Sequence, residues 1–341
     1  MNHPPYHLRV NKAVDRLLLV RIMRAVLTPE VKCTYYSLAG AFLEDLRLVD
    51  YMFPWVKLES IESSKETVIR QSFHKFRSDI SLHNIEIGEF VNEYDAEDKP
   101  EDVAVFWLDY TNLNYPNITT FSTLLTKVPV GSIVRVTLRS EPNDTHKVLK
   151  DYLTEPMIKM VCDTTNEKFR TDFAKVIHTG HDQSCVEQPE FARTVQLMLR
   201  NAASQALDKP KSTRDFLHLH SVRYNDQTQM LSVTGIVYER SAIGGTPQTA
   251  MSKDYFAERL KNEAFVNFDW PEPAVINIPA LTFKERLKLE EFLPLQEAET
   301  GAILSSALGY KIADSRKNSD EQMSQYAQYY REYPNFIKAT F

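Results

Sequence analysis

One segment near the start of the chain constrains the fold most. A strand-like run over 31–38 leads to Gly40, a helix-like pattern over 41–53 follows, and a second strand-like run covers 57–62. Glycine allows a sharp turn between strand and helix. Glu62 closes the second strand 22 positions after Gly40, about the spacing at which an α/β sheet places a carboxylate on the ribose hydroxyls of a nucleotide-type cofactor. Because only one glycine is present, a plain βαβ packing turn stays open as the alternative.

Strand and helix patterns keep alternating beyond this segment. Strands are expected at 31–38, 57–62, 80–83, 103–108 and 132–138, and helices at 41–53, 64–76, 86–93 and 117–128. Such alternation indicates parallel strands joined by right-handed crossovers. The run 103–108 is apolar throughout, which is typical of a strand buried on both faces.

The pattern changes after Glu141. Helices are expected at 146–161, 166–178 and 188–207, and strands at 216–223 and 231–239. The polar stretch 224–230 between these two strands predicts the turn of an antiparallel hairpin. The sequence therefore predicts a Rossmann-like α/β fold in which five parallel strands are closed by a terminal hairpin, with a helical insertion before it. Most doubly wound nucleotide-binding sheets lack that hairpin.

The chain is expected to have three parts. Residues 1–30 form an N-terminal helical segment, 31–240 the Rossmann-like domain with a helical insertion at about 145–210, and 253–341 a C-terminal helical appendage. A mobile loop is expected at 241–252. The individual helices outside the sheet domain are expected at 11–28, 253–262, 282–293, 295–308 and 320–332.

Composition narrows the classes of partner and compartment. The net charge is −6, which disfavours a general grip on nucleic acid but leaves a local basic patch open. The three cysteines, Cys33, Cys162 and Cys185, are an odd number and form no Cys-x-x-Cys pair. This argues for a reducing compartment, the cytoplasm. No apolar run approaches the roughly 20 residues that a membrane helix needs, so no membrane partner is expected.

Histidine pairs are poor metal-site candidates in this sequence. His178 and His181 have a ligand-like spacing, but no third ligand is evident. His218 and His220 fall on one face of a strand, where a hydrogen-bonded structural pair is the simpler interpretation. No metal is therefore expected.

Ligands of open α/β sheets bind at the carboxyl ends of the parallel strands. The residues expected there are Ser37, Ala39 and Gly40, then Glu62, then His83 and Asn84, then Asp109 and Tyr110, and finally Arg139 and Glu141. Such a set suits a sulfonium or another adenosine-bearing cation. Asp109 could hold an amino group or take a substrate proton, and Tyr110 could face a cation or stack on a ring. For Arg139 and Glu141, a structural ion pair is an equal alternative.

Several segments carry a family resemblance. Residues 6–16, 35–45, 106–111, 133–142, 231–238 and 326–336 resemble a bacterial family of putative O-methyltransferases. The resemblance covers nearly the whole chain. It implies the fold of class I S-adenosylmethionine-dependent methyltransferases, whose seven-stranded sheet also ends in an antiparallel hairpin.

The resemblance also implies roles for the residues at the strand ends. The cofactor-binding residues would be Ser37, Ala39, Gly40, Glu62, His83, Asn84 and Asp109. Asp109 and Tyr110 would lie beside the reacting methyl group as the catalytic candidates, with His83 as a weaker candidate base. Asn11 and Lys12 fall in a family motif to which no role is assigned.

The implied activity is transfer of a methyl group from S-adenosylmethionine to an oxygen or nitrogen of an unknown acceptor. The family pattern has two adjacent glycines where this chain has Ala39–Gly40, and a proline at Ala41. Because alanine resists positive φ, the turn is expected to be wider or the cofactor to bind weakly. The alternative is a catalytically degenerate binding module in a bacterial multi-protein system, such as defence, with a protein partner or a second copy. A nucleic-acid modifier using the basic segment 9–24 is a third hypothesis.

Overall fold

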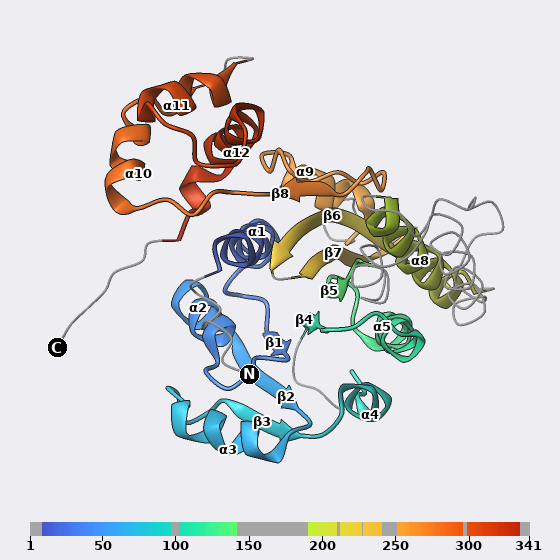
Figure 1. The fold of residues 1–341 in the computed structure, drawn as a ribbon. Coiled ribbons are helices and arrows are strands. Elements are labelled where there is room, and N and C mark those ends of the chain that lie inside the picture. The colour runs from blue at the N-terminus through green and yellow to red at the C-terminus, as the bar shows by residue number, and fades with distance from the viewer. Residues whose placement is uncertain are drawn as a thin grey trace, which may run out of the picture. The chain divides into compact units, whose positions relative to one another are not determined.

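The structure is a computed structural model (Figure 1). It describes residues 9–96, 102–141, 190–209, 212–226, 228–240, 251–295 and 299–334. The expected helices 146–161 and 166–178, most of the expected loop 241–252, and His178 and His181 lie outside these ranges. The chain divides into two compact units. One comprises 20–223 and 228–274, and the other comprises 1–19, 224–227 and 275–341.

Strands and helices alternate along the first unit as the sequence predicts. In chain order the elements are β1 (Cys33–Ser37), α2 (Glu44–Met52), β2 (Lys57–Glu62), α3 (Lys65–His74), β3 (Ser81–Asn84), α4 (Ile87–Glu93), β4 (Val103–Asp109), α5 (Tyr115–Lys127), β5 (Ile133–Arg139), α8 (Glu190–Leu207), β6 (Arg214–Asp226), β7 (Thr228–Glu239) and α9 (Lys253–Leu260). Helix α1 (Val10–Val26) precedes them.

The sheet has the order β3-β2-β1-β4-β5-β7-β6-β8, where β8 is Ala274–Ile276. The first five strands pair in parallel, and β7 runs antiparallel to β5. This mostly parallel sheet with a terminal antiparallel hairpin confirms the predicted Rossmann-like fold class.

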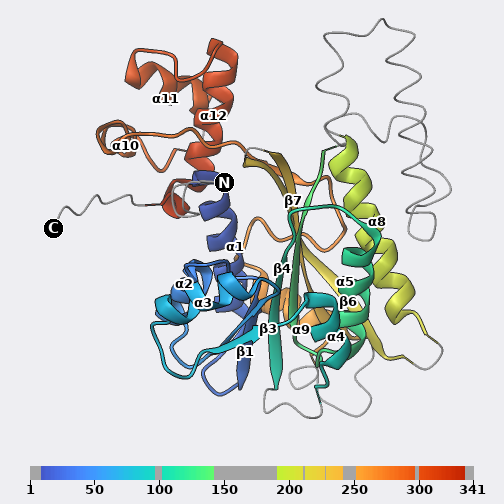
Figure 2. The ribbon, with the colours of Figure 1, turned by 60° about the horizontal axis from the view of Figure 1, so that its bottom comes forward.

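Helices cover both faces of the sheet. Helices α2 and α3 lie over one face, and α4, α5 and α8 lie over the other (Figures 1 and 2). Strands β4 and β5 are buried at every position except the last, as expected for strands covered on both sides. The carboxyl ends of the parallel strands are therefore the places where polar side chains reach solvent.

The hairpin differs from its prediction. Strand β6 continues to Asp226 and β7 begins at Thr228, so the seven-residue polar turn expected at 224–230 was wrong. Met230 pairs with Arg139 in the ladder of β5, and Tyr224 is buried. Polar residues at the ends of long strands satisfy their backbone groups in the ladder while their side chains reach water, and this pattern mimics a loop in the sequence.

The second unit contains the C-terminal helices. They are α10 (Phe283–Glu290), α11 (Thr300–Leu308), α12 (Arg316–Tyr329) and the 3₁₀ helix η3 (Tyr330–Glu332). Helix α12 begins four residues earlier than expected because the Ser315 hydroxyl caps it by accepting the Asn318 N–H. Tyr326, Tyr329 and Tyr333 are buried, so these three aromatic residues of the tail pack inside rather than forming an exposed surface.

Gly235 of β7 lies at a closely packed point of the hairpin, where a larger residue would not fit. A Cβ there would meet the ring of Phe216 and would lie 2.7 Å from the carbonyl oxygen of Leu217. We expect Gly235→Ala to lower the free energy of unfolding by about 2–3 kcal/mol, since overpacking forces strained shifts. In Gly88→Ala, the new Cβ would make only an ordinary 3.4 Å contact with Thr120. Urea unfolding that shows equal stability for the two variants would contradict this packing.

No helix in the described part of the chain is long and apolar enough to cross a membrane.

Candidate functional site

The turn after β1 is longer than a helix starting at residue 41 would leave. Helix α2 begins at Glu44 and not at residue 41, so residues 38–43 form the connection. Gly40 has a φ of 59° and Leu43 a φ of 54°, both left-handed. Left-handed backbone is costly for leucine, and complete burial of its side chain holds Leu43 in place. The expected start of the helix was wrong because this second left-handed residue delays it.

A buried glutamine on α3 fixes the turn from outside. The side-chain amide of Gln71 donates to the carbonyl oxygen of Gly40 at 2.9 Å. The Ser60 hydroxyl of β2 donates to the other side-chain atom of Gln71, its Oε1, at 3.1 Å. Gln71 is fully buried, so the turn carbonyl is tied to the neighbouring strand through a rigid link.

A buried carboxylate fixes the same turn from inside. Asp45, in the first turn of α2, accepts hydrogen bonds from the Ser37 hydroxyl and from the Tyr35 hydroxyl, the latter at 3.1 Å. All three residues are buried. Ser37 therefore binds the helix start, a role that sequence reasoning missed. The signal was present as an acidic residue on the inner face of a predicted helix.

Glu62 and Asp109 flank this turn. Ser37 pairs with Ser60 of β2 on one side and with Trp107 of β4 on the other. Glu62 and Asp109 each lie two residues further along these strands, on the same face as Ser37, because side chains alternate along a strand. With strands about 4.8 Å apart, their Cα atoms are separated by roughly 10 Å across β1.

The carboxylate of Glu62 has capacity to bind a ligand. Its Oε1 accepts the backbone N–H of Ser64 at 2.8 Å. Among the residues that the structure describes, its Oε2 has no hydrogen-bond partner. The Asn84 side-chain amide donates to the carbonyl oxygens of Glu62 and Ser63 at 3.1 and 2.9 Å. Asn84 thus holds the end of β2 in place beside its own strand.

His83 lies on the opposite face from Asn84. Its Nε2 is 2.9 Å from Oε2 of Glu59, and Lys57 pairs with Oε1 of Glu59 at 2.5 Å. Burial raises the pKa of Glu59, but the hydrogen bonds from His83 and Lys57 outweigh it and hold the pKa at about 2. The structure therefore separates His83 from Glu62 and Asn84. Sequence reasoning missed Glu59, whose contact with His83 depends on the register of two strands.

Asp109 and Tyr110 also point to different environments. Asp109 is half-buried at the end of β4, opposite Thr137. Tyr110 belongs to the buried cluster that contains Tyr36 and Phe106. Burial raises the pKa of the Tyr110 phenol well above its usual range, so the hydroxyl stays protonated at neutral pH.

A further expectation concerned Arg139 and Glu141 at the end of β5. Arg139 and Glu141 form an ion pair at 3.5 Å, which is the structural alternative considered for them. In the second unit, the side chain of Asn11 accepts the Ile278 N–H at 2.9 Å and donates to the Asn225 carbonyl at 3.3 Å. Asn11 thus ties three distant segments of that unit together.

A family described as "Putative O-methyltransferase" matches the chain over residues 4–341.

The chain belongs to this family.

The resemblance seen in the sequence is confirmed by that match, and the sheet order of this O-methyltransferase family member agrees with it. No curated protein matches the chain by sequence.

The solved structures that are similar to this family member include several named as methyltransferases. One is the apo form of the S-adenosylmethionine-dependent methyltransferase SibL, with 14% identity, a TM-score of 0.35, and coverage of 65% of this chain and 54% of SibL. The match therefore spans only about half of SibL. Another is the plantazolicin methyltransferase BpumL with a triazolic desmethylPZN analog and SAH, with 13% identity, a TM-score of 0.33, and coverage of 65% of this chain and 85% of BpumL. A third is geranyl diphosphate C-methyltransferase from Streptomyces coelicolor A3(2), with 8% identity, a TM-score of 0.30, and coverage of 64% and 74%.

The histidine pair of β6 is hydrogen-bonded in this family member. Nδ1 of His218 lies 2.5 Å from the Asn267 carbonyl oxygen, and its Nε2 lies 2.7 Å from the Ser221 hydroxyl. Nδ1 of His220 lies 3.1 Å from the Phe265 carbonyl oxygen. In the described residues, no group of three or more His, Cys, Asp or Glu side chains is arranged to hold a metal ion. Burial lowers the pKa of His218 to about 4 and that of His220 to about 3.

This burial predicts a dependence of stability on pH. Because the folded-state pKa values lie below the unfolded value of 6.5, the unfolded chain binds more protons below pH 6.5. Stability is fully present above pH 6.5 and is lost as the pH falls toward 4 and 3. We expect each histidine to cost about 2 kcal/mol of unfolding free energy between pH 7 and 5. When urea unfolding is repeated across this pH range, the unfolding free energy of His218→Gln should fall less steeply with decreasing pH than that of the unsubstituted protein. An equally steep fall would contradict the buried, neutral state of His218.

Proposed function

We propose that this protein transfers a methyl group from S-adenosylmethionine to an oxygen or nitrogen of its acceptor. One observation supports this most: in a member of an O-methyltransferase family, Glu62 and Asp109 flank a left-handed glycine turn at the carboxyl edge of a Rossmann-like sheet. Ligands of open α/β sheets bind at that edge.

The residues present fit the cofactor. Oε2 of Glu62, which has no hydrogen-bond partner among the described residues, suits two ribose hydroxyls together with Oε1. The N-cap residue Leu43 has no side-chain acceptor, so it gives the first turn of α2 no capping bond. Among the described residues only Leu43 and Trp270 are non-glycine residues with positive φ. Ala39 therefore adopts a conformation that alanine tolerates, while Gly40 remains where the turn is left-handed.

S-adenosylmethionine supplies a methyl group on a positively charged sulfur, and an acceptor lone pair displaces that sulfur in line. The protein's task is to position the acceptor, because alignment within roughly 3–3.5 Å supplies most of the acceleration. We assign ribose binding to Glu62 and the adenine side to Asn84. Asp109 holds the amino group of the methionine part or takes the acceptor's proton. His83 is hydrogen-bonded to Glu59 on the other face of the sheet, so we give it no part in the reaction. We do not assign Tyr110 as a base either, because its phenol stays protonated.

Ser37 and Ala39 act through the shape of the turn in this proposal. Ser37 anchors α2 through Asp45, and Ala39 is buried next to Gly40 in the chain. We place the protein in the cytoplasm, because an odd number of cysteines without a Cys-x-x-Cys pair suits a reducing compartment.

A thermal shift series tests the proposal. A ligand that binds only the folded state at 100 times its Kd adds about 2.7 kcal/mol to apparent stability. S-adenosylmethionine and its demethylated product should each raise the melting temperature, whereas adenosine alone should raise it less. No shift with either ligand, in a protein that unfolds cooperatively, would favour the degenerate binding module instead.

A further inference from the structure

Helices α2 and α3 carry an exposed apolar and aromatic surface next to the turn. Phe73 is 85% exposed, Tyr51 83%, Ile69 54% and Phe42 40%. Phe42 belongs to the turn itself, Tyr51 to α2, and Ile69 and Phe73 to α3. Single exposed apolar residues are common, but a contiguous exposed apolar surface marks an interaction site. We call this surface, with the cations described next, the α2–α3 face.

Contacts between side chains show that the face is continuous. The His74 ring lies 5.1 Å from the Phe42 ring and 5.3 Å from the Phe73 ring. The Arg70 guanidinium lies 5.0 Å from the centre of the Phe42 ring. Arg47 donates to the His74 carbonyl oxygen at 2.6 Å. Tyr51 is one helical turn beyond Arg47 on α2, so the two residues share a side of that helix.

The cations of this face are available to an anionic partner. Arg47, Lys65 and Arg70 have no acidic partner among the described residues. Lys65 is exposed and stands one helical turn before Ile69, which stands one turn before Phe73. Glu66 is the one carboxylate of α3, and no ion pair joins it to a described residue.

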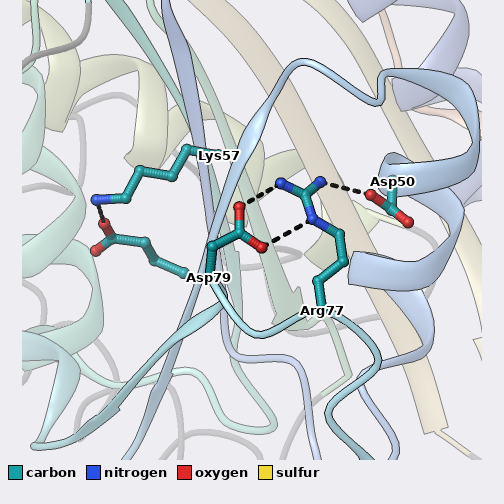
Figure 3. Close-up of polar contacts among 5 residues, drawn as sticks. Asp50, Lys57, Arg77 and Asp79 are labelled. Atoms are coloured by element: carbon teal, nitrogen blue, oxygen red, sulfur yellow. Dashed lines mark hydrogen bonds and ion pairs between the residues drawn. The ribbon is translucent and has the colours of Figure 1, made fainter.

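Arg77, unlike these three cations, has acidic partners. Its guanidinium pairs with Asp50 at 2.5 Å and with Asp79 at 2.5 and 3.0 Å, as Figure 3 shows. Arg77 thus engages two carboxylates at once and balances the charge of one of them. Arg47, Lys65 and Arg70 have no such carboxylate partner among the described residues, so the α2–α3 face offers three cations to an anionic partner although the net charge of the chain is −6.

We propose that the α2–α3 face binds single-stranded nucleic acid. Such strands are bound where cations contact the phosphates and aromatic rings stack on the bases, and this face presents both together. An acidic peptide would use the charges but not the flat, exposed rings of Phe73 and Tyr51. Phe42 lies in the turn whose carbonyl is held by Gln71, so a bound strand reaches the proposed donor site. That the strand carries the methyl acceptor rests on the proposed function, whereas the binding does not.

Fluorescence anisotropy with labelled 12-nucleotide oligo-U and oligo-dT, measured without cofactor, tests the binding. If three cations contact phosphates, the logarithm of the association constant should fall linearly with the logarithm of the salt concentration, with a slope of about −2. Phe73→Ala should weaken binding at least about fivefold. Arg70→Gln should reduce the slope by about 0.7. Both side chains are exposed, so both variants are expected to fold.

The second unit offers matched controls. Phe283 is 70% exposed, and Lys284 beside it is exposed. Phe283→Ala and Lys284→Gln should leave the affinity and the slope unchanged. Absence of binding at 50 mM salt, or equal losses in the Phe73 and Phe283 variants, would overturn the proposal. Displacement of the oligonucleotide by poly-glutamate of equal charge would also overturn it, because an acidic peptide would then be the better partner. A dimer detected by light scattering that Phe73→Ala dissociates would overturn it as well, because a second copy of the chain would then cover the face.

Discussion

Asp45→Ala should lower the free energy of unfolding by about 2–5 kcal/mol. The substitution leaves the hydroxyls of Ser37 and Tyr35 buried without their shared acceptor, and each such group costs about 1–3 kcal/mol. It also releases the start of α2 from β1, so the turn that carries Gly40 loses its inner anchor. Urea unfolding monitored by circular dichroism measures the loss of stability.

Asp45→Asn is the matched control for this prediction. Its amide oxygen still accepts a hydrogen bond, so we expect it to lose less than half as much stability as Asp45→Ala. Asp254→Ala, an exposed acidic residue in the first turn of α9, should change stability by about 0.5 kcal/mol or less. Similar losses in Asp45→Ala and Asp254→Ala would show that Asp45 does not hold the turn.

Glu62→Ala should weaken binding of S-adenosylmethionine and of its demethylated product roughly 100-fold. Two hydrogen bonds to a charged acceptor contribute about 1.5–3 kcal/mol each, and the lower value applies to a half-buried side chain. Glu62→Gln keeps one acceptor oxygen and should weaken binding about tenfold. Isothermal titration calorimetry of both variants measures these affinities.

Glu93→Gln controls for the change in net charge, since Glu93 is exposed at the end of α4. It should bind both ligands as the unsubstituted protein does. If Glu62→Ala binds them with unchanged affinity while remaining folded, ribose recognition by Glu62 is wrong.

Much of the fold could be predicted because its signals are local. Strand β2 was predicted at its observed bounds, and the buried run of β4 at nearly its own, since continuous apolar residues indicate a strand covered on both faces. Gly40 was expected at a turn and adopts a left-handed backbone. The order of five parallel strands before an antiparallel hairpin followed from the same alternation.

The parts that failed depend on contacts between distant residues. The start of α2 is set by Leu43, whose left-handed backbone is stabilised by burial and not by local preference. His83 was expected at the same strand end as Asn84, and the structure shows in addition that its side chain contacts Glu59 on the other face of the sheet, a pairing between two strands that the sequence did not reveal. A single sequence gives strand positions but not which side chains meet across them.

A crystal structure of the protein saturated with S-adenosylhomocysteine tests the central claim most directly. The account predicts ligand density over the 38–43 turn, with both ribose hydroxyls within hydrogen-bonding distance of the Glu62 carboxylate. Density at another place, or no density here in crystals that diffract well at saturating ligand, would contradict it.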